Sequence, residues 1–573
     1  MKSLLKYMRG YSKECVLGPL FKLFEATLEL FVPLIVASII DNGILASDKG
    51  HIIKMVVLLV AIGLAGLLAA VTAQFFAAKA AVGFVGSLKQ ALFDHLTRLS
   101  DAQTDRLGIS TLITRMTSDM NQVQTGVNLT LRLLLRSPFV VFGAMIMAFT
   151  VDFKAALIFA VTIPLLSVVV FGIMLICIPL YKKVRERLDK VLLRVRENLS
   201  GVRVIRAFCR ETEEKTSFTA ENEELTSVQR VVGRVSSLLD PLTFVLINFA
   251  VIALVYVGAL RVEYGILTQG AVVALYNYMS QILVELIKLA DLIINITKSL
   301  ACANRIAAVM DEKNIQEISS DDTVQNNFAV CFEDVTLNYT ETGEPALEHI
   351  SFTASKGETI GIIGGTGSGK TSLVSLIPRL YDASAGTVTV NGRNVISMTT
   401  DSLRDIIGIV PQKAMLFKGT VRSNLLWGNE NASDEELWAA LKVAQADSFV
   451  KDKGGLDCNV EAMGRNFSGG QRQRLTIARA LVKKPQILIL DDSSSALDTA
   501  TDAALRAALS ALPFSPTVFN VSQRTGAISH CDKIIVLEDG ECVGCGTHEQ
   551  LLEGCDIYRE IHESQFKKDG AEA

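Results

Sequence analysis

The sequence predicts a multi-domain membrane protein, a six-helix transmembrane domain followed by a soluble α/β domain. Half of the 573 residues are apolar and 20% are charged, but these averages hide two unlike halves. Residues from about 15 to 300 carry several long apolar stretches, whereas the rest has the composition of a soluble domain. We expect the transmembrane domain over 1–310, a polar linker over 311–327 and the soluble domain over 328–573.

Six segments are apolar enough to cross a membrane, since a spanning helix needs about 20 mostly apolar residues. They lie at about 16–40, 55–80, 128–150, 155–180, 241–260 and 270–300. The long connections 81–127 and 181–240 contain no proline, so nothing forces their helices to end. We therefore expect long helical extensions that project from one side of the bilayer.

The distribution of basic residues indicates which side that is. Residues 181–237 hold thirteen Lys and Arg, whereas the three short turns between spans hold Lys49, Lys154 and Arg261, with Lys54 at a helix edge. An excess of Lys and Arg marks the cytoplasmic face. The extensions, the soluble domain and the amino terminus are therefore predicted to be cytoplasmic. The basic, amphipathic start predicts a surface helix and shows no removable signal peptide.

Ionisable side chains occur inside two predicted spans, where they are costly and suggest function by default. They are Glu25 and Glu29, one turn apart in the first span, and Glu285, Lys288 and Asp291 on one face of the sixth. One interpretation is an acidic, water-accessible cavity that favours cationic substrates. The other, which we favour, is ion pairing of Lys22 with Glu25 and Glu29 and of Lys288 with Glu285.

The soluble domain opens with an alternating strand pattern and then carries a glycine-rich loop between an apolar strand and a helix. The loop and the first helical residues are Gly364, Gly365, Thr366, Gly367, Ser368, Gly369, Lys370, Thr371 and Ser372. Glycines let successive backbone N–H groups point at phosphate oxygens, and the helix N-terminus adds positive potential. The spacing predicts that Lys370 reaches the β- and γ-phosphates of ATP and that the Thr371 hydroxyl binds Mg²⁺.

A second strand, 487–491, ends in Asp491, whose carboxylate is suited to hold the same Mg²⁺. The segment Phe467-Ser468-Gly469-Gly470-Gln471 resembles the ABC-family signature L-S-G-G-Q, with Phe in place of Leu. With this motif the whole chain resembles type IV ABC exporters of the bacterial multidrug kind, in which six spans precede one cassette. The resemblance implies an exporter in the bacterial inner membrane that binds ATP and Mg²⁺.

The resemblance also implies roles for single residues. Tyr339 looks like the aromatic residue that stacks on adenine, and Gln412 looks like the glutamine that links Mg²⁺ to the membrane domain. Asp498 ends the Ser-Ala-Leu-Asp loop that crosses the interface between paired cassettes. In such pairs the signature of one subunit closes the phosphate loop of the other. The cytoplasmic hairpins that transmit this closure are expected near 108–118 and 205–215, against a loop that includes Gly464 and Arg465.

Two residues depart from the family pattern. Asp492 stands where the family has a glutamate that activates the attacking water, and Gln523 stands where the family has a histidine beside the γ-phosphate. Losing one methylene withdraws the carboxylate by about 1.5 Å, and a displacement of about 1 Å can cost ~10²-fold in rate. Gln523 can donate a hydrogen bond but cannot become cationic. The catalytic set of Asp492, Gln523 and Gln412 is therefore predicted to cleave bound ATP slowly.

These departures predict a heterodimer in which this chain is the degenerate-site subunit. Its partner would be a second half-transporter with the intact glutamate and histidine. The exported compound would be a drug, a lipid or a peptide, and the motifs do not distinguish these. The alternative function is a nucleotide-gated channel or a regulatory membrane subunit without active pumping.

Composition argues against other classes of protein. A formal net charge of −4 disfavours nucleic acid as a partner. The ten cysteines suit a reducing compartment rather than a disulfide framework. Cys542 and Cys545 form a C-x-x-C pair without a second, well-spaced pair of ligands, so packing explains them better than a metal or redox site.

Overall fold

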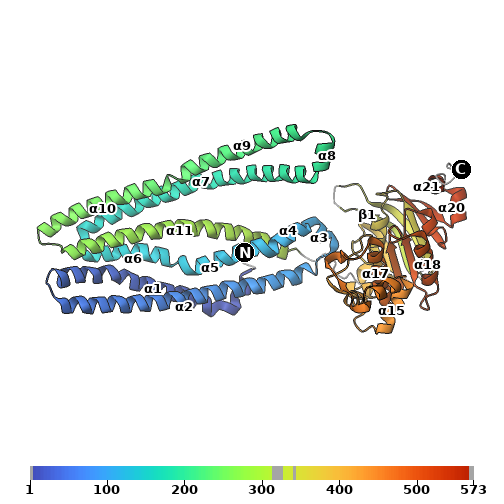
Figure 1. Ribbon diagram of the computed structural model, residues 1–573, viewed down its shortest axis with the longest axis horizontal. Helices are drawn as coiled ribbons and strands as arrows, with labels where there is room; N and C mark the ends of the chain where they lie inside the picture. The colour runs from blue at the N-terminus through green and yellow to red at the C-terminus, as the bar shows by residue number, and fades with distance from the viewer. Residues whose placement is uncertain (1–3, 313–326, 340–342, 567–573) are drawn as a thin grey trace. The chain divides into compact units, whose positions relative to one another are not determined.

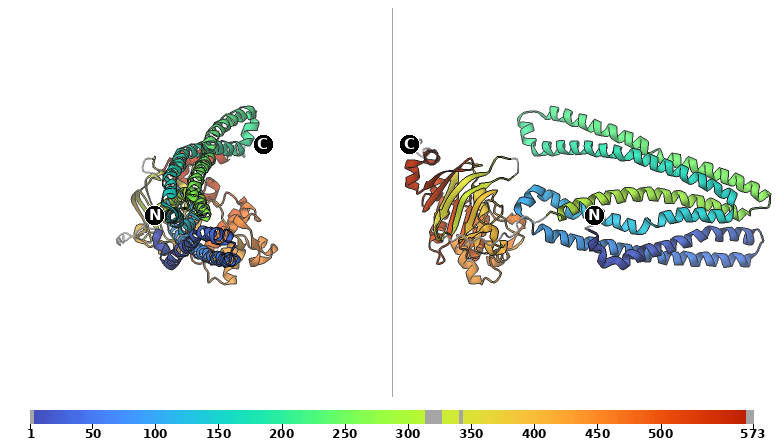
Figure 2. Two further views of the ribbon diagram at one scale, coloured as in Figure 1. Left: turned by 90° about the vertical axis from the view of Figure 1, so that its left-hand side faces the viewer. Right: turned by 180° about the vertical axis from the view of Figure 1, so that it is seen from behind.

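The structure, a computed structural model, describes residues 4–312, 327–339 and 343–566. The predicted linker, 311–327, falls almost entirely outside these residues. The chain divides into two compact units, Met1–Thr97 with Ile109–Glu312 and Arg98–Gly108 with Lys313–Ala573. Figures 1 and 2 show long helices in the first unit and sheets with shorter helices in the second.

The first unit consists of long helices, which run side by side in both figures, and of several short helical segments. They are η1 (Leu4–Tyr11), α1 (Ser12–Ser38), η2 (Ile39–Ile44), α2 (Lys49–Leu96), α4 (Ile109–Thr114), η3 (Arg115–Asp119), α5 (Met120–Leu133), α6 (Arg136–Val151), α7 (Phe153–Ser200), α8 (Val202–Ala207), α9 (Glu211–Ser236), α10 (Leu239–Glu263) and α11 (Gln269–Met310). Both α2 and α7 run for 48 residues. Their length confirms that these helices continue beyond the predicted spans 55–80 and 155–180.

Five helical stretches of the described chain could cross a membrane by length and composition. They are Leu4–Ile44, Lys49–Leu96, Ile109–Val151, Phe153–Ser200 and Glu211–Glu263. These stretches contain the first five predicted spans. The sixth predicted span, 270–300, lies within α11, which packs against α1, α5, α6 and α10 and buries many of its side chains. This sixth span stays a prediction.

Polar residues in the short turns set where the membrane helices begin. Asp48 accepts hydrogen bonds from the backbone N–H groups of Gly50 and His51 at the start of α2. Asp152 accepts one at 2.7 Å at the start of α7, and Thr268 caps α11 in the same way. A side-chain oxygen at this position satisfies an N–H group that the helix itself cannot.

The second unit contains two main sheets. The larger has the strand order β12-β11-β3-β10-β9-β6, and only its β11–β12 pair is antiparallel. Its strands are β3 (Thr359–Gly364), β6 (Ile407–Val410), β9 (Ile487–Asp491), β10 (Thr517–Val521), β11 (Lys533–Glu538) and β12 (Glu541–Gly546). The smaller, antiparallel sheet has the order β2-β1-β4-β5, with β1 (Val330–Leu337), β2 (Leu347–Ala354), β4 (Ala385–Val390) and β5 (Arg393–Asn394).

The helices of the second unit cover these sheets and form a separate helical core. They are α12 (Lys370–Leu376), α13 (Thr400–Asp405), α14 (Val421–Leu425), α15 (Asp434–Val443), α16 (Asp447–Asp452), α17 (Gly469–Val482), α18 (Thr499–Ser510), α19 (Thr525–Ile528), α20 (His548–Gly554) and α21 (Asp556–Phe566). The buried core around α15 and α17 is distinct from the core between the sheets. The carboxyl ends of the adjacent parallel strands β3, β10 and β9 share one edge of the larger sheet.

The short helix α3 (Asp101–Leu107) belongs to the second unit, although the sequence places it between α2 and α4 of the first. Ser100 opens it with a capping box. The hydroxyl of Tyr381 donates a hydrogen bond to Asp105 Oδ2 at 2.5 Å. We expected the segment that contacts the soluble domain at 108–118, but the segment that belongs to the second unit is Arg98–Gly108. The capping box at Ser100 starts a separate helix there.

Candidate functional site

The glycine-rich loop leaves β3 and enters α12, as its sequence predicts. Gly367 and Gly369 have φ angles of 89° and 92°, a left-handed conformation that glycine adopts without strain. A Cβ at Gly369 would lie 2.7 Å from the carbonyl oxygen of Ala346, so this close approach also requires glycine. The backbone is thereby curled in the way that lets N–H groups converge on an anion.

Lys370 lies inside this loop and is only 9% exposed. Its ammonium donates to the carbonyl oxygens of Gly364 and Gly365 at 2.9 and 2.5 Å, and to the Ser368 hydroxyl at 3.3 Å. Burial lowers the pKa of Lys370, against the raising effect of two nearby aspartates. The loop therefore holds a partly desolvated cation, whose attraction for phosphate is stronger than it would be in water.

Asp491, at the end of β9, faces the first turn of α12. The Thr371 hydroxyl donates to its two carboxylate oxygens at 3.2 and 3.1 Å, and Asp491 is 5% exposed. Burial raises the pKa of the Asp491 carboxyl, and the hydrogen bond from Thr371 opposes that rise. A hydroxyl beside a carboxylate fits Mg²⁺, which uses such oxygens together with phosphate oxygens and water.

Asp492, the next residue after Asp491, joins this cluster to Gln412. Its φ of 45° is left-handed, a conformation that aspartate tolerates better than most residues. Its Oδ2 accepts a hydrogen bond from Gln412 Nε2 at 3.3 Å. The structure therefore brings together five of the residues that the sequence predicts for the site, namely Lys370, Thr371, Asp491, Asp492 and Gln412.

Tyr339 lies beside the same helix. Its hydroxyl donates to Ser372 Oγ at 2.8 Å, and its ring stands edge-on to that of Tyr381 with 5.0 Å between the centroids. Tyr339 is 52% exposed, and the stacking of its ring on adenine stays a prediction.

Gln523 follows the carboxyl end of β10, the strand that lies between β3 and β9 in the larger sheet. The residue is exposed, and its backbone oxygen accepts a hydrogen bond from Gln565 Nε2 at 2.8 Å. Gln523 thus occupies the strand-end position that the sequence analysis assigns to it.

The predicted signature forms the start of α17. The Ser468 hydroxyl accepts from the Gln471 N–H at 3.3 Å, and Gln471 Oε1 accepts from the Ser468 N–H at 3.1 Å. A Cβ at Gly469 would meet no atom within 4 Å, whereas one at Gly470 would lie 2.8 Å from the carbonyl oxygen of Ala496. Gly469 therefore faces open space, while Gly470 packs against the loop that leads to Asp498.

Phe467 differs from the rest of its motif. It is 3% exposed, and its ring packs against Phe449 with 6.3 Å between the centroids. The sequence analysis grouped Phe467 with the nucleotide-binding residues, but its side chain belongs to the hydrophobic core. Its contribution is to hold the start of α17 in place.

Asp498 caps α18, accepting from the N–H and the hydroxyl of Thr501 at 2.9 and 2.8 Å. Among the described residues, no hydrogen bond or ion pair joins the segment Ser468–Gln471 to Lys370. The signature and the phosphate loop of this chain are therefore two separate clusters.

A cavity of about 460 Å³ lies beside the signature, and Gln412, Arg465, Gly469 and Gln473 line part of it. Gln473 is 3% exposed, and its Nε2 is buried without a hydrogen-bond partner in the described part of the chain. The sequence analysis missed Gln473, because nothing in the sequence separates a buried glutamine on a helix from an exposed one.

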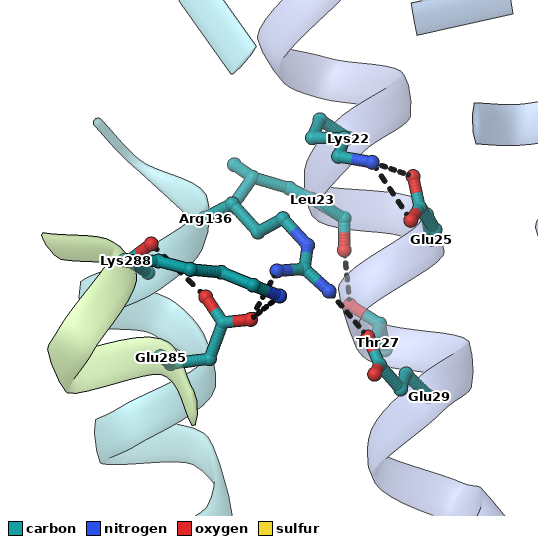
Figure 3. A network of polar contacts seen from close by, with 9 residues as sticks. Lys22, Leu23, Glu25, Thr27, Glu29, Arg136, Glu285 and Lys288 are labelled. Carbon is teal, nitrogen blue, oxygen red and sulfur yellow. Dashed lines mark hydrogen bonds and ion pairs between the residues drawn. The ribbon is translucent and has the colours of Figure 1, made fainter. Parts of the chain in front are cut away.

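The first unit contains a second polar cluster, which joins three membrane helices (Figure 3). Arg136, at the start of α6, donates to Glu29 of α1 at 2.6 Å and to Glu285 of α11 at 2.5 Å. Ser137 and Lys288 also donate to Glu285, at 3.0 and 2.9 Å. The Arg136 and Glu285 side chains are only 7% and 4% exposed, so their charges neutralise each other away from water.

These contacts favour the pairing interpretation of the intramembrane charges. Lys22 pairs with Glu25 at 2.5 Å and Lys288 pairs with Glu285, as the pairing interpretation predicts. Glu29 instead pairs with Arg136, a residue that the sequence analysis overlooked although it lies in the predicted span 128–150. The cluster holds three basic and three acidic side chains, so it is not an acidic cavity. A pocket of about 390 Å³ adjoins it.

Arg136→Met is expected to lower the apparent melting temperature of the detergent-solubilised protein by several degrees. Removing one partner of a buried ion pair costs about 3–5 kcal/mol, because the other charge stays buried and unpaired. The matched control is Arg187→Met, whose pair with Glu224 is exposed and is worth about 0–1 kcal/mol. Adding Glu285→Met to Arg136→Met is expected to restore part of the loss. Equal melting temperatures for both single variants would contradict a stabilising role for the cluster.

The sequence of the chain is similar to that of known proteins over both units. Residues 15–286 match the family described as ABC transporter transmembrane region, and residues 347–495 match the family described as ABC transporter. An uncharacterised ABC transporter ATP-binding protein of Mycobacterium tuberculosis is 35% identical over 571 residues, covering 98% of this chain and 97% of that protein. Another from Bacillus subtilis, YfiB, is 33% identical over 574 residues, and each chain is covered completely.

Two further matches concern a flippase and an exporter. An ATP-dependent lipid A-core flippase of Desulfotalea psychrophila is 33% identical over 477 residues, covering 83% of each chain. The solved structure of a bacterial Atm1-family ABC exporter with ATP bound superposes with a TM-score of 0.79 at 23% identity. The superposition covers 97% of this chain and 98% of the exporter. At that identity the likeness concerns the fold.

Proposed function

Since the chain belongs to the ABC transporter family, with a membrane domain and a domain that hydrolyses ATP to drive transport, we propose that it is the degenerate-site half of a heterodimeric exporter. It would export small hydrophobic or amphipathic compounds, whether drugs, lipids or peptides, by alternating access. The extensions of α2 and α7 and the second unit would lie in the cytoplasm of a bacterial cell, as the basic residues of 181–237 suggest.

The observation that carries this proposal is the pair of aspartates at the end of β9. Asp491 is engaged by Thr371, whereas the carboxylate next to it belongs to Asp492 and is one methylene shorter than that of the glutamate expected there. One C–C bond is about 1.5 Å long, so the Asp492 carboxylate falls short of a water placed for a glutamate. Such a displacement is large enough to cost orders of magnitude in rate.

Gln523 weakens the same site further. A histidine at this position could carry a positive charge beside the γ-phosphate, and a glutamine cannot. Binding is a separate matter, because Lys370, the glycine loop and the ring of Tyr339 have the geometry to hold ATP. We infer a site that retains nucleotide and cleaves it slowly.

Thr371, Asp491 and Gln412 would hold the Mg²⁺ that accompanies ATP. When bound, the ion supplies positive charge that neutralises the phosphate oxygens. It would also offset the cost of burying the Asp491 carboxylate. The residues of the chain would bind the phosphates and orient the nucleotide, whereas Asp492 and Gln523 would limit how well a water can be activated.

The signature argues for a second chain. In this chain a capping box fixes Ser468–Gln471 at the start of α17, and Gly469 faces open space. The segment could therefore close the phosphate loop of a partner subunit. The productive site would therefore consist of this signature and a partner's intact catalytic residues. Hydrolysis there would reset the membrane domain from its outward-open state.

Inverted membrane vesicles test this function directly. Vesicles with this chain alone are expected to show ATP hydrolysis at least about 10²-fold slower than vesicles with both half-transporters, since the chain alone lacks a competent site. Only the pair should accumulate a fluorescent amphipathic compound when ATP is added. Brisk hydrolysis and uptake by this chain alone would overturn the heterodimer, and passive conductance without uptake would overturn export.

A further inference from the structure

The first unit contains an apolar cavity of about 390 Å³, separate from the polar cluster around Arg136. Four elements enclose it, through side chains such as Met8 of η1, Phe84 of α2, Val127 of α5 and Leu300 of α11. A volume of this size is typical of sites that hold small organic ligands, about 300–1,000 Å³.

In the described part of the chain, the side chains that line this cavity offer a ligand no free hydrogen-bond donor. Its two hydroxyl groups belong to Thr130 and Ser299, and each already donates to a backbone carbonyl oxygen at 2.7 Å, those of Gly126 and Gln122. A polar ligand would lose its hydrogen bonds to water here without replacement, which is costly. The cavity therefore suits a hydrocarbon chain.

The lining residues all lie at the ends of predicted spans. Phe84 follows the span 55–80 and Val127 precedes the span 128–150, while η1 precedes the first span. The cavity is therefore placed at one surface of the membrane, where the hydrocarbon layer meets the lipid headgroups.

Basic side chains lie on the same amino-terminal segment. Lys6, Arg9 and Lys13 are exposed on η1 and the first turn of α1. The acidic residue of this stretch, Glu14, is paired with Lys79 at 2.9 Å, so it does not cancel their charge. Clustered Lys and Arg beside a membrane attract anionic lipids. We propose that the cavity takes one acyl chain of an anionic phospholipid, whose headgroup contacts these three cations.

Photo-crosslinking in nanodiscs tests this site with the full-length protein. The discs contain phosphatidylcholine and a trace of lipid with a diazirine in its acyl chain, either phosphatidylglycerol or phosphatidylcholine. Phosphatidylglycerol is expected to label residues 123–131 and 296–303 about tenfold more than the phosphatidylcholine probe, because only it satisfies both the cavity and the cations.

Two sets of variants separate the cavity from the cations. Val127→Phe fills the cavity and is expected to remove most labelling of these segments by either probe. The matched control, Val71→Phe, makes the same change at a position of α2 that is 61% exposed and leaves the labelling unchanged. Replacing Lys6, Arg9 and Lys13 together with Gln lowers phosphatidylglycerol labelling to the phosphatidylcholine level. Equal labelling by both lipids in the native protein, or labelling that Val127→Phe leaves intact, would overturn the proposal.

Discussion

In the proposed heterodimer, Gly469→Asp in this chain is expected to lower ATP turnover by about 100-fold, because like charges brought together at an interface cost several kcal/mol. A Cβ at Gly469 meets open space, so the chain itself can accommodate the substitution. Negative charge at the start of a helix is even favourable for the isolated chain. The loss would instead arise in the complex, where the new carboxylate faces the phosphates held by the partner.

The matched substitution at this chain's own phosphate loop has a much smaller expected effect. Lys370→Ala removes the cation that the loop holds, but on our proposal the site it impairs is already slow, so turnover is expected to fall by less than about fivefold. Gly469→Asn has the shape of Gly469→Asp without its charge and serves as the control for the signature. Steady-state hydrolysis by the purified heterodimer measures all three variants. Equal, severe losses in Gly469→Asp and Lys370→Ala would show two equivalent sites and would contradict the degenerate-site assignment.

The conformation of the glycine-rich loop could be predicted from the sequence, because its motif dictates its own backbone. Gly367 and Gly369 adopt left-handed φ angles that their residue type makes possible, and Lys370 follows at a fixed spacing. The contact between Thr371 and Asp491 was predictable for a similar reason, since parallel strands bring their carboxyl ends to one edge. In each case local sequence and sheet topology together determine the geometry.

Contacts between distant membrane helices were harder to predict. Arg136 meets Glu29 and Glu285, which are 107 and 149 positions away in the sequence, and only the packing of α1, α6 and α11 brings them together. A signal was nevertheless present, because an arginine inside a predicted span needs a partner. The break between α5 and α6 also has a local cause, since Pro138 lies in the first turn of α6, where proline is tolerated.

Phe467 and α3 show two other features that the sequence did not predict correctly. A motif places Phe467 next to nucleotide-binding residues, but the hydrophobic effect places its side chain in the core, and a linear motif does not report burial. The capping box at Ser100 was visible in the sequence, yet its helix lies within a connection whose lack of proline suggested one continuous helix. The connection is therefore divided between α2 and α3 by the cap at Ser100, although it contains no proline.

Restoring the family residues is expected to speed hydrolysis at the proposed degenerate site. The double variant Asp492→Glu with Gln523→His should raise hydrolysis at the Lys370 site by about 10–100-fold, since general-base help alone is worth ~10²–10⁴. Gly469→Asp in the same chain is expected to stop hydrolysis at the site that holds the partner's phosphate loop. The Lys370 site stays active, because the partner's signature closes it. Hydrolysis by heterodimers that carry Gly469→Asp, with and without the double variant, therefore reports on the Lys370 site alone.

The control replaces Asp492 with Gln instead of Glu, together with Gln523→His. Glutamine has the length of glutamate but cannot accept a proton from water, so no gain is expected. Residue 492 has a φ of 45°, which glutamate tolerates less well than aspartate, so the repaired site is expected to gain activity while losing some stability. A gain with Gln as large as with Glu would mean that length, not basicity, limits the site. No gain with either would mean that Asp492 and Gln523 are not what makes it slow.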